Sequence, residues 1–194
     1  MIINTIDGIV HRLKRKSRRV FNIVKSSSDV MELLDGRLPD TDTIFKIISL
    51  TGGIASVSFI RAVAKEETIE ELTASTLRIG RKQFEYLKKL SEDGILRKAS
   101  FFIGSIMKRA DTKNEKYDYY TEFTQYCEKC GWNQYVINNH SKIILMHTQK
   151  NYYVLETSSN LNENPSIEQF SFENNKELYD FYIDFFEACK EVVR

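Results

Sequence analysis

No stretch of this sequence comes close to the roughly 20 consecutive apolar residues that a membrane-spanning helix needs. The start of the chain also lacks an apolar run of signal-peptide length, so we expect a cytoplasmic protein with no membrane partner. Proline is scarce: only Pro39 and Pro165 are present, both among polar residues, which indicates loops. With 42% apolar and 28% charged residues in a chain of 194, the composition is that of a globular protein with a real hydrophobic core.

Cysteine is nearly as scarce, with three residues. Cys127 and Cys130 form a C-x-x-C pair, but no second pair of cysteines or histidines follows at the spacing of a zinc site. The pair also closes an expected helix just before Gly131, whereas a redox motif belongs at a strand-to-helix junction. We therefore interpret both cysteines as small buried apolar residues, and we predict no metal and no cofactor.

The net charge of +1 hides an uneven distribution. Residues 1–27 carry about +6 and the rest of the chain about −5, because the first segment holds one acid, Asp7, against seven bases. Those bases are Arg12, Lys14, Arg15, Lys16, Arg18, Arg19 and Lys25. Such a basic arm suggests that nucleic acid is bound, chiefly by the six bases from Arg12 to Arg19. The alternative is a solvated helix face, or an arm that docks on the acidic remainder of the chain.

The basic segment also shows an apolar periodicity. Ile9, Leu13, Val20 and Val24 lie within residues 8–25 at positions that could share one face of a helix, with the bases opposite. The next residues, 26–29, then indicate a break and the N-cap of a short helix that ends near residue 36. A loop follows to residue 43. We therefore expect a basic N-terminal arm with a short helix at residues 1–43, and the main domain at residues 44–194.

From residue 44 onward, apolar runs alternate with amphipathic segments. The expected strands are 44–50, 99–107, 132–146 and 152–157, with further apolar runs at 57–63 and 72–79. The expected helices are 81–92, 117–130 and 177–193. This alternation predicts an α/β fold with a mixed, largely parallel sheet flanked by helices. No internal repeat at a fixed period is present, which leaves one candidate active site per chain.

Two short segments contain the side chains with the clearest chemistry. His140 and Lys142 are two residues apart in an expected strand, so they share a face. Ser158 and Asn160 share a face in the same way if their segment stays extended, and a hairpin around residues 149–151 would bring the two segments side by side. Histidine, lysine, serine and asparagine would then converge on one spot.

Those residue types suit a phosphate group. Lysine and asparagine supply donors, serine supplies a hydroxyl, and histidine can act as nucleophile or general acid near neutral pH. Glu168 is a candidate to hydrogen-bond the far ring nitrogen of His140 and to fix its tautomer. His147 lacks such a context, and we interpret it as a strand residue without a chemical role.

These residues resemble the motif of the phospholipase D superfamily, which has a histidine, any residue and a lysine, then an acid, and then a Gly-Ser-x-Asn turn. The matching positions are His140, Lys142, Ser158 and Asn160, with Glu168 in the place of the family's downstream acid. Two positions depart. His147 stands where the family has an acid five residues after the lysine, and Thr157 stands where the family has the glycine.

The resemblance implies a phospholipase D-like fold over about residues 44–193 and a reaction that needs no metal. One histidine attacks phosphorus to form a phosphohistidine, a second histidine protonates the leaving oxygen, and water hydrolyses the intermediate. Because this chain has one copy of the motif, the second histidine would come from a homodimer partner. Small members of the family with a single motif resemble nucleases, which agrees with the basic arm.

Two main hypotheses stay open from the sequence. One is a dimeric phosphodiesterase that acts as a nuclease. The other is a protein that keeps the fold without turnover, and that binds nucleic acid or has a structural role, for example in a phage or a mobile element. A lipid phosphodiesterase is a weaker third hypothesis, because one motif and no membrane segment are present. Under the plainest interpretation, His140 is an ordinary buried histidine and Lys142 a solvated strand residue.

Overall fold

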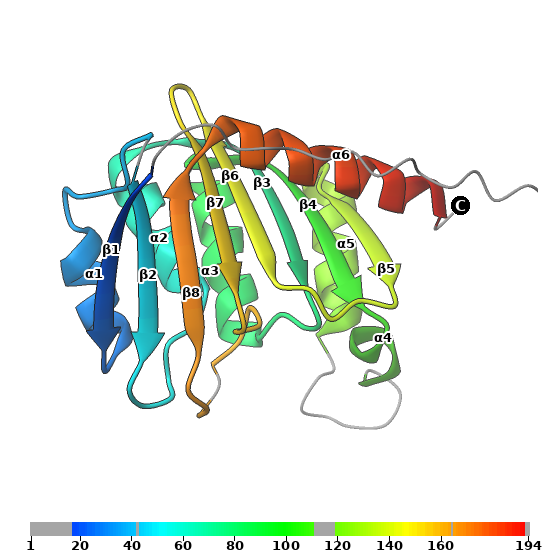
Figure 1. The fold of residues 1–194 in the computed structure, drawn as a ribbon. Helices are drawn as coiled ribbons and strands as arrows, with labels where there is room; N and C mark the ends of the chain where they lie inside the picture. Colours follow the sequence, from blue (N-terminus) through cyan, green and yellow to red (C-terminus); the bar gives the residue numbers. More distant parts are fainter. Residues whose placement is uncertain (1–16, 42, 111–118, 164, 193–194) are drawn as a thin grey trace, which may run out of the picture.

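The computed structural model describes residues 17–41, 43–110, 119–163 and 165–192. Its centre is an eight-stranded sheet with the order β1-β2-β8-β7-β6-β3-β4-β5 (Figure 1). The strands are β1 (Arg18–Val24), β2 (Thr43–Ser49), β3 (Ile69–Thr76), β4 (Leu96–Gly104), β5 (Asn133–Ile137), β6 (Ile143–Thr148), β7 (Tyr152–Thr157) and β8 (Gln169–Asn174). The helices are α1 (Ser27–Leu34), α2 (Val57–Glu66), α3 (Arg81–Glu92), α4 (Ile106–Ala110), α5 (Tyr120–Cys130) and α6 (Lys176–Val192).

The sheet is mixed, as the sequence predicts. The pairs β1–β2, β3–β4 and β4–β5 are parallel, and the pairs that involve β8, β7 and β6 are antiparallel. Across these pairings, six of the eight strands run in one direction, and β6 and β8 run in the other. The six strands that share a direction therefore end at one edge of the sheet, which is the lower edge in Figure 1.

Helices cover the two faces of the sheet unequally. Helices α1, α2, α3 and α5 lie behind the sheet in Figure 1, and α6 crosses the front of only part of it. The larger core cluster fills the space on the first side, and its aromatic members include Phe59, Phe84 and Phe123. A smaller cluster joins Tyr179 and Phe186 of α6 to the strands beneath. The chain is thus a three-layer α/β structure in which the α6 layer is incomplete.

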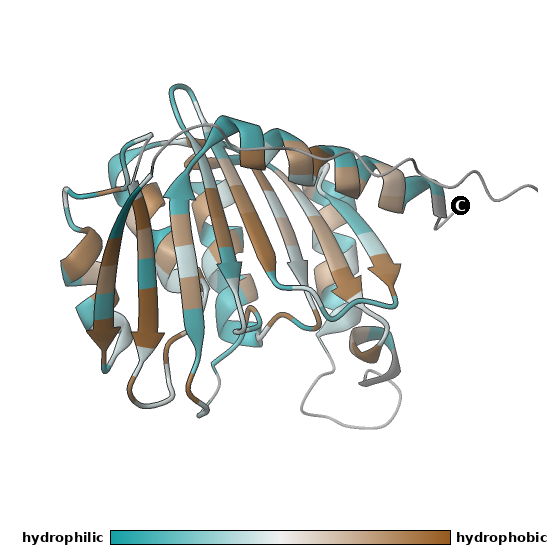
Figure 2. Cartoon of the chain, in the orientation of Figure 1, coloured by the Kyte–Doolittle hydropathy of each residue, from teal (hydrophilic) through white to brown (hydrophobic). Residues whose placement is uncertain are grey.

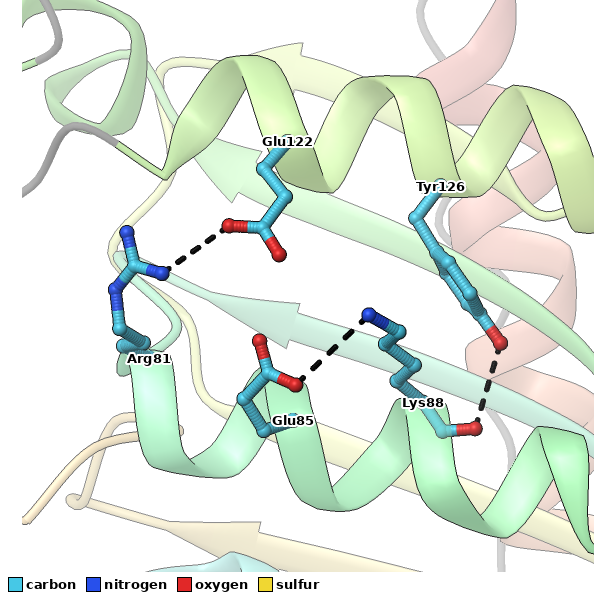
Figure 3. A network of polar contacts seen from close by, with 5 residues as sticks. All are labelled: Arg81, Glu85, Lys88, Glu122 and Tyr126. Atoms are coloured by element: carbon cyan, nitrogen blue, oxygen red, sulfur yellow. Dashed lines mark hydrogen bonds and ion pairs between the residues drawn. The ribbon is translucent and has the colours of Figure 1, made fainter.

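The contact between α3 and α5 shows what holds the larger layer (Figure 3). Arg81 of α3 pairs with Glu122 of α5 at 3.1 Å, and the hydroxyl of Tyr126 donates to the backbone oxygen of Lys88 at 3.3 Å. The ion pair is half exposed, so it contributes at most about 1 kcal/mol. Beneath it, Phe84 packs edge-on against a second phenylalanine of α5, with the ring centres 5.3 Å apart. Aromatic packing is therefore the larger contribution to this contact.

Residues 18–24 form strand β1, so the helix expected over residues 8–25 is wrong for this part. The side chains alternate with period two: Val20 and Val24 turn towards the helices, and Phe21 and Ile23 face the opposite side. Branched valine and isoleucine favour this pleated geometry once β2 lies alongside. Val24 belongs to the main buried core together with two residues of α1, Val30 and Leu34, so the described residues before β2 share one core with the rest.

Other expectations have mixed outcomes. Ser26 and Asp29 form a capping box, and α1 begins and ends close to the expected positions. The apolar run at 57–63 forms helix α2. The region 132–146 is two strands with a loop between them rather than one long strand, and β8 was not expected at all. Of the two cysteines expected to be buried, Cys127 is buried and Cys130 is only partly buried. Burial raises the pKa of the Cys127 thiol to about 12.

Candidate active site

The residues singled out by the sequence gather at the edge of the sheet where most strands end. His140 and Lys142 lie in the loop just before β6, and Ser158 directly follows β7. Glu168 directly precedes β8. The antiparallel hairpin of β6 and β7 turns at residues 149–151, as expected, and it places residue 143 opposite residue 156. The hairpin therefore brings the two predicted segments together at one end.

His140 and Lys142 are in direct contact although neither is in a strand. The ammonium nitrogen of Lys142 lies 3.2 Å from Nδ1 of His140 and donates to the backbone oxygen of the same residue at 2.7 Å. The His140 side chain is exposed, so the plainest interpretation of a buried histidine is wrong. An exposed imidazole beside a lysine is accessible to an anionic substrate.

A buried asparagine that the sequence analysis did not identify holds the His140 loop in place. The amide nitrogen of Asn139 donates to Oγ of Ser75 at 2.8 Å and to the backbone oxygen of Phe102 at 2.9 Å. Its amide oxygen accepts from both the backbone nitrogen and the hydroxyl of Ser141, each at 2.8 Å. Asn139 thus ties the residues on either side of His140 to the ends of β3 and β4, and it directs His140 outwards.

Ser158 and Glu168 form the second part of the site. The hydroxyl of Ser158 donates to the carboxylate of Glu168 and accepts from the backbone nitrogen of Gln169 at 3.0 Å. Glu168 is 4% exposed, so this carboxylate is fixed in place. The role expected for Glu168 in fixing the tautomer of His140 stays a prediction.

The turn after β7 forms without the glycine of the family motif. Oγ1 of Thr157 accepts from the backbone nitrogen of Ser159 at 2.9 Å, which closes a short side-chain turn. Among the described residues, positive φ angles occur only at glycines, so Thr157 has an ordinary backbone conformation. Its backbone nitrogen also bonds to the oxygen of Lys142 at 3.1 Å, which links the two segments of the site.

Asn160 is nearly buried and faces the end of β3. Its amide oxygen accepts from the backbone nitrogen of Leu77 at 3.1 Å and from Oγ1 of Thr76 at 3.3 Å. Among the described residues, no protein acceptor is bonded to its amide nitrogen, so the oxygen is anchored and the two N–H donors remain for a ligand. Asn139 also reaches the backbone oxygen of Thr76, at 3.5 Å, so the two asparagines flank the same strand end.

Electrostatics distinguish Lys142 from a surface lysine. Partial burial lowers the pKa of Lys142, and the charge of Glu168 opposes that change. A phosphate group near this ammonium would replace the lost hydration and favour its charged form. The site therefore provides one cation and several hydrogen-bond donors, which suits an anionic ligand.

His147 lies away from this edge. It is four residues along β6 from Ile143, about 13 Å at the usual rise of a strand. Its ring stacks on Tyr152, with the centres 4.7 Å apart and the planes at 12°, beside Tyr179 of α6. The position where the family has an acid is thus a packing position between the sheet and α6 in this chain.

The predicted nucleic-acid-binding bases are only partly described. Arg12, Lys14, Arg15 and Lys16 lie outside the described residues. Arg18 and Arg19 are exposed at the start of β1, whose far end, Val24, lies at the edge with the site. Six residues of strand separate Arg18 from that edge, about 20 Å. These two arginines therefore do not contact the His140 site of their own chain.

The described residues offer neither a cluster of metal ligands nor a membrane-spanning helix. No group of three or more histidine, cysteine, aspartate or glutamate side chains is arranged there to hold a metal ion. None of the helices within the described ranges is long and apolar enough to span a bilayer.

No family model and no curated protein matches this sequence. Among solved structures, polyphosphate kinase from Porphyromonas gingivalis is similar, with a TM-score of 0.50 and 16% identity over 66% of this chain and 23% of that chain. Phosphatidylserine synthase from Haemophilus influenzae Rd KW20 is similar with a TM-score of 0.50 and 13% identity, over 75% of this chain and 38% of that chain. Both have folds of the phospholipase D superfamily.

This chain has a phospholipase D-like fold. A third similar structure is the archaeal chromatin protein TrmBL2, described as showing a novel mode of DNA binding, with a TM-score of 0.50 and 11% identity over 86% of this chain and 58% of that chain. The chain spans less than two thirds of the length of each neighbour. At these identities the likeness concerns the fold alone.

Proposed function

We propose that this chain is a metal-independent phosphodiesterase that cleaves nucleic acid through a phosphohistidine on His140 and works as a homodimer. The observation that carries the proposal is the contact between His140 and Lys142 at the same sheet edge as the Ser158–Glu168 pair and Asn160. An exposed imidazole surrounded by donors suits attack on a phosphodiester.

The residues take distinct roles in this mechanism. Lys142 and the amide of Asn160 hold the non-bridging oxygens, and a nitrogen of His140 attacks phosphorus as the bond to the leaving oxygen breaks. His140 of the partner subunit gives its proton to that oxygen. Water then attacks phosphorus, the P–N bond breaks, and the proton of the water passes to the same partner histidine. Ser158 and Glu168 hold the second segment in place.

The test is cleavage of a labelled oligonucleotide in the presence of a chelator. We expect wild-type cleavage to survive chelation, and His140→Ala to lower the rate by about 10²–10⁴-fold. His147→Ala is the matched control, because its ring packs under α6, and it should change the rate little. A rapid acid-free quench with a ³²P-labelled substrate should leave label on the wild type and none on His140→Ala. Cleavage that vanishes with chelator, or persists in His140→Ala, would falsify this mechanism.

The second candidate is a phospholipase D-like protein without turnover that binds nucleic acid or has a structural role, for example in a phage or mobile element. Two observations favour it: His147 replaces the family's acid, and the chromatin protein is similar over 86% of this chain. Oligonucleotide binding by a wild type that shows neither cleavage nor label would support this candidate over the first.

A further inference from the structure

Among the described residues, no element covers one half of the α6 side of the sheet. Tyr179 and Phe186 of α6 pack on Phe102, Leu145 and Val154, which belong to β4, β6 and β7. Figure 1 shows no described element over the same side of β1, β2 and β8. The described elements therefore cover one half of this face and leave the other half open.

The open half exposes large apolar side chains, which in most sheets are covered by a second layer of helices or strands. Phe21 and Ile23 of β1 are 74% and 71% exposed, and Ile48 of β2 is 46% exposed. Figure 2 shows these two strands as largely hydrophobic. They border a hollow of about 640 Å³ that extends to β7 and β8. Large exposed apolar side chains grouped on one surface mark a contact surface. Arg19 and Lys46 add positive charge on its β1–β2 side, and Glu156 lines the hollow on its β7 side.

Helix α6 has a second apolar stripe on its outer side. Phe181 and Phe185 are one turn apart, are 38% and 43% exposed, and point away from the cluster that Tyr179 and Phe186 make with the sheet. Three exposed residues around the stripe are acidic: Glu177, Asp184 and Glu191. An acidic helix stripe with two phenylalanines complements the β1–β2 side of the sheet surface, where exposed apolar side chains lie beside Arg19 and Lys46.

We propose that the outer stripe of α6 packs on the open β1–β2–β8 surface of a second copy of this chain, and that the second copy does the same in return. This inference rests on the proposed function only in taking the protein to be a homodimer. It adds which surfaces form the dimer interface. The helix has 17 residues and is about 25 Å long, which is enough to cross three strands about 4.8 Å apart.

The symmetry of this packing follows from the fold. With the two faces opposed, a two-fold axis along the strands exchanges the covered and the open halves, so each α6 meets the open half of the other copy. A two-fold axis across the strands would instead put α6 on α6. The axis along the strands also keeps the lower edges of both sheets at the same end. The two His140 sites then lie at one end of the dimer, as a reaction with two histidines requires.

Sedimentation of full-length variants tests both surfaces. We expect Phe21→Asp with Ile23→Asp, and separately Phe181→Asp with Phe185→Asp, to raise the dimer dissociation constant by at least about 100-fold. The matched control adds acid to the helix-covered face through Lys89→Asp with Gln125→Asp, both exposed, and should leave the dimer unchanged. Circular dichroism and thermal unfolding check that each variant folds.

Mixing the two defective pairs tests reciprocity. A mixed dimer has one contact with both surfaces intact and one with both altered, so the mixture should dimerise more tightly than either variant alone. A monomeric wild type, dissociation by the β1 pair only, or a mixture that fails to dimerise would each overturn the proposal. Dissociation by the β1 pair only would point to pairing of β1 edges. Sedimentation needs no activity, so an inactive dimer would refute the nuclease and leave this interface standing.

Discussion

At the scale of single residues, the site depends on side chains whose neighbours restrict them. The amide nitrogen of Asn139 donates to residues of β3 and β4, and its amide oxygen accepts from Ser141. The side chain is 7% exposed. A buried amide that loses its partners costs about 1–3 kcal/mol, so this arrangement is strongly specified. The orientation of the His140 side chain therefore depends on the hydrogen bonds that Asn139 makes.

Asn139→Ala should lower the cleavage rate about 10–100-fold while the protein stays folded, because His140 loses its fixed direction. Asn138→Ala is the matched control, since residue 138 is adjacent and exposed, and it should change little. NMR of the His140 ring gives a second readout, and the presence of only three histidines makes its assignment simple. An unchanged rate together with an unchanged ring signal in Asn139→Ala would refute the positioning role.

At the scale of elements, the β6–β7 hairpin is anchored at the end away from the site. Glu67, just after α2, accepts from Oγ1 of Thr148 at 2.6 Å, from the amide of Asn151 at 2.8 Å and from the hydroxyl of Tyr153 at 2.7 Å. Burial raises the pKa of Glu67, but these hydrogen bonds outweigh it and the net pKa lies below its usual value. One carboxylate therefore fixes the register of the hairpin that carries both site segments.

Glu67→Gln should destabilise the protein by about 1–2 kcal/mol at neutral pH, allowing for the partial exposure of the carboxylate. Because the folded pKa lies below the unfolded one, the stabilisation is present above the usual value of 4.5 and is lost as the pH falls through the folded pKa. The difference between wild type and variant in urea unfolding should thus shrink in acid. Glu66→Gln, at the exposed neighbour, should show no such pH dependence.

At the scale of the whole molecule, the described basic N-terminal residues and the candidate site at His140 lie at different ends of the sheet. The described start of the basic arm is at the edge opposite His140, so a nucleic acid held by both must run along the molecule or reach the partner subunit. If the arm binds nucleic acid, we expect it to supply affinity rather than sequence preference, since contacts to phosphates do not depend on sequence.

Replacing Arg12, Lys14, Arg15 and Lys16 by glutamine in the full chain should flatten the dependence of log Kd on log salt by about 3–4 for duplex DNA. Sequence preference should stay the same. Lys89→Gln with Lys129→Gln, on the helix-covered face, is the control and should leave the slope unchanged. Fluorescence anisotropy over a salt series measures both, and an unaltered slope in the arm variant would show that the arm does not contact the phosphates.

Local patterns in the sequence determined several features. The period of apolar residues fixed α3 at 81–92, and the cap at Ser26 fixed the start of α1, because both signals act within a few residues. The spacing of His140 and Lys142, and of Ser158 and Asn160, identified the segments that gather at one edge. The alternation of strands and helices was enough for the fold class.

Tertiary structure alone decided the rest. Residues 18–24 fit either a helix or a strand locally, and pairing with β2 settled the matter, because a strand needs a neighbour to satisfy its backbone. Asn139 could not be recognised from the sequence, since its partners are residues 75 and 102, which are 64 and 37 positions away. For the same reason, neither the position of His147 under α6 nor the half-open face follows from local sequence: both depend on where α6 lies on the assembled sheet.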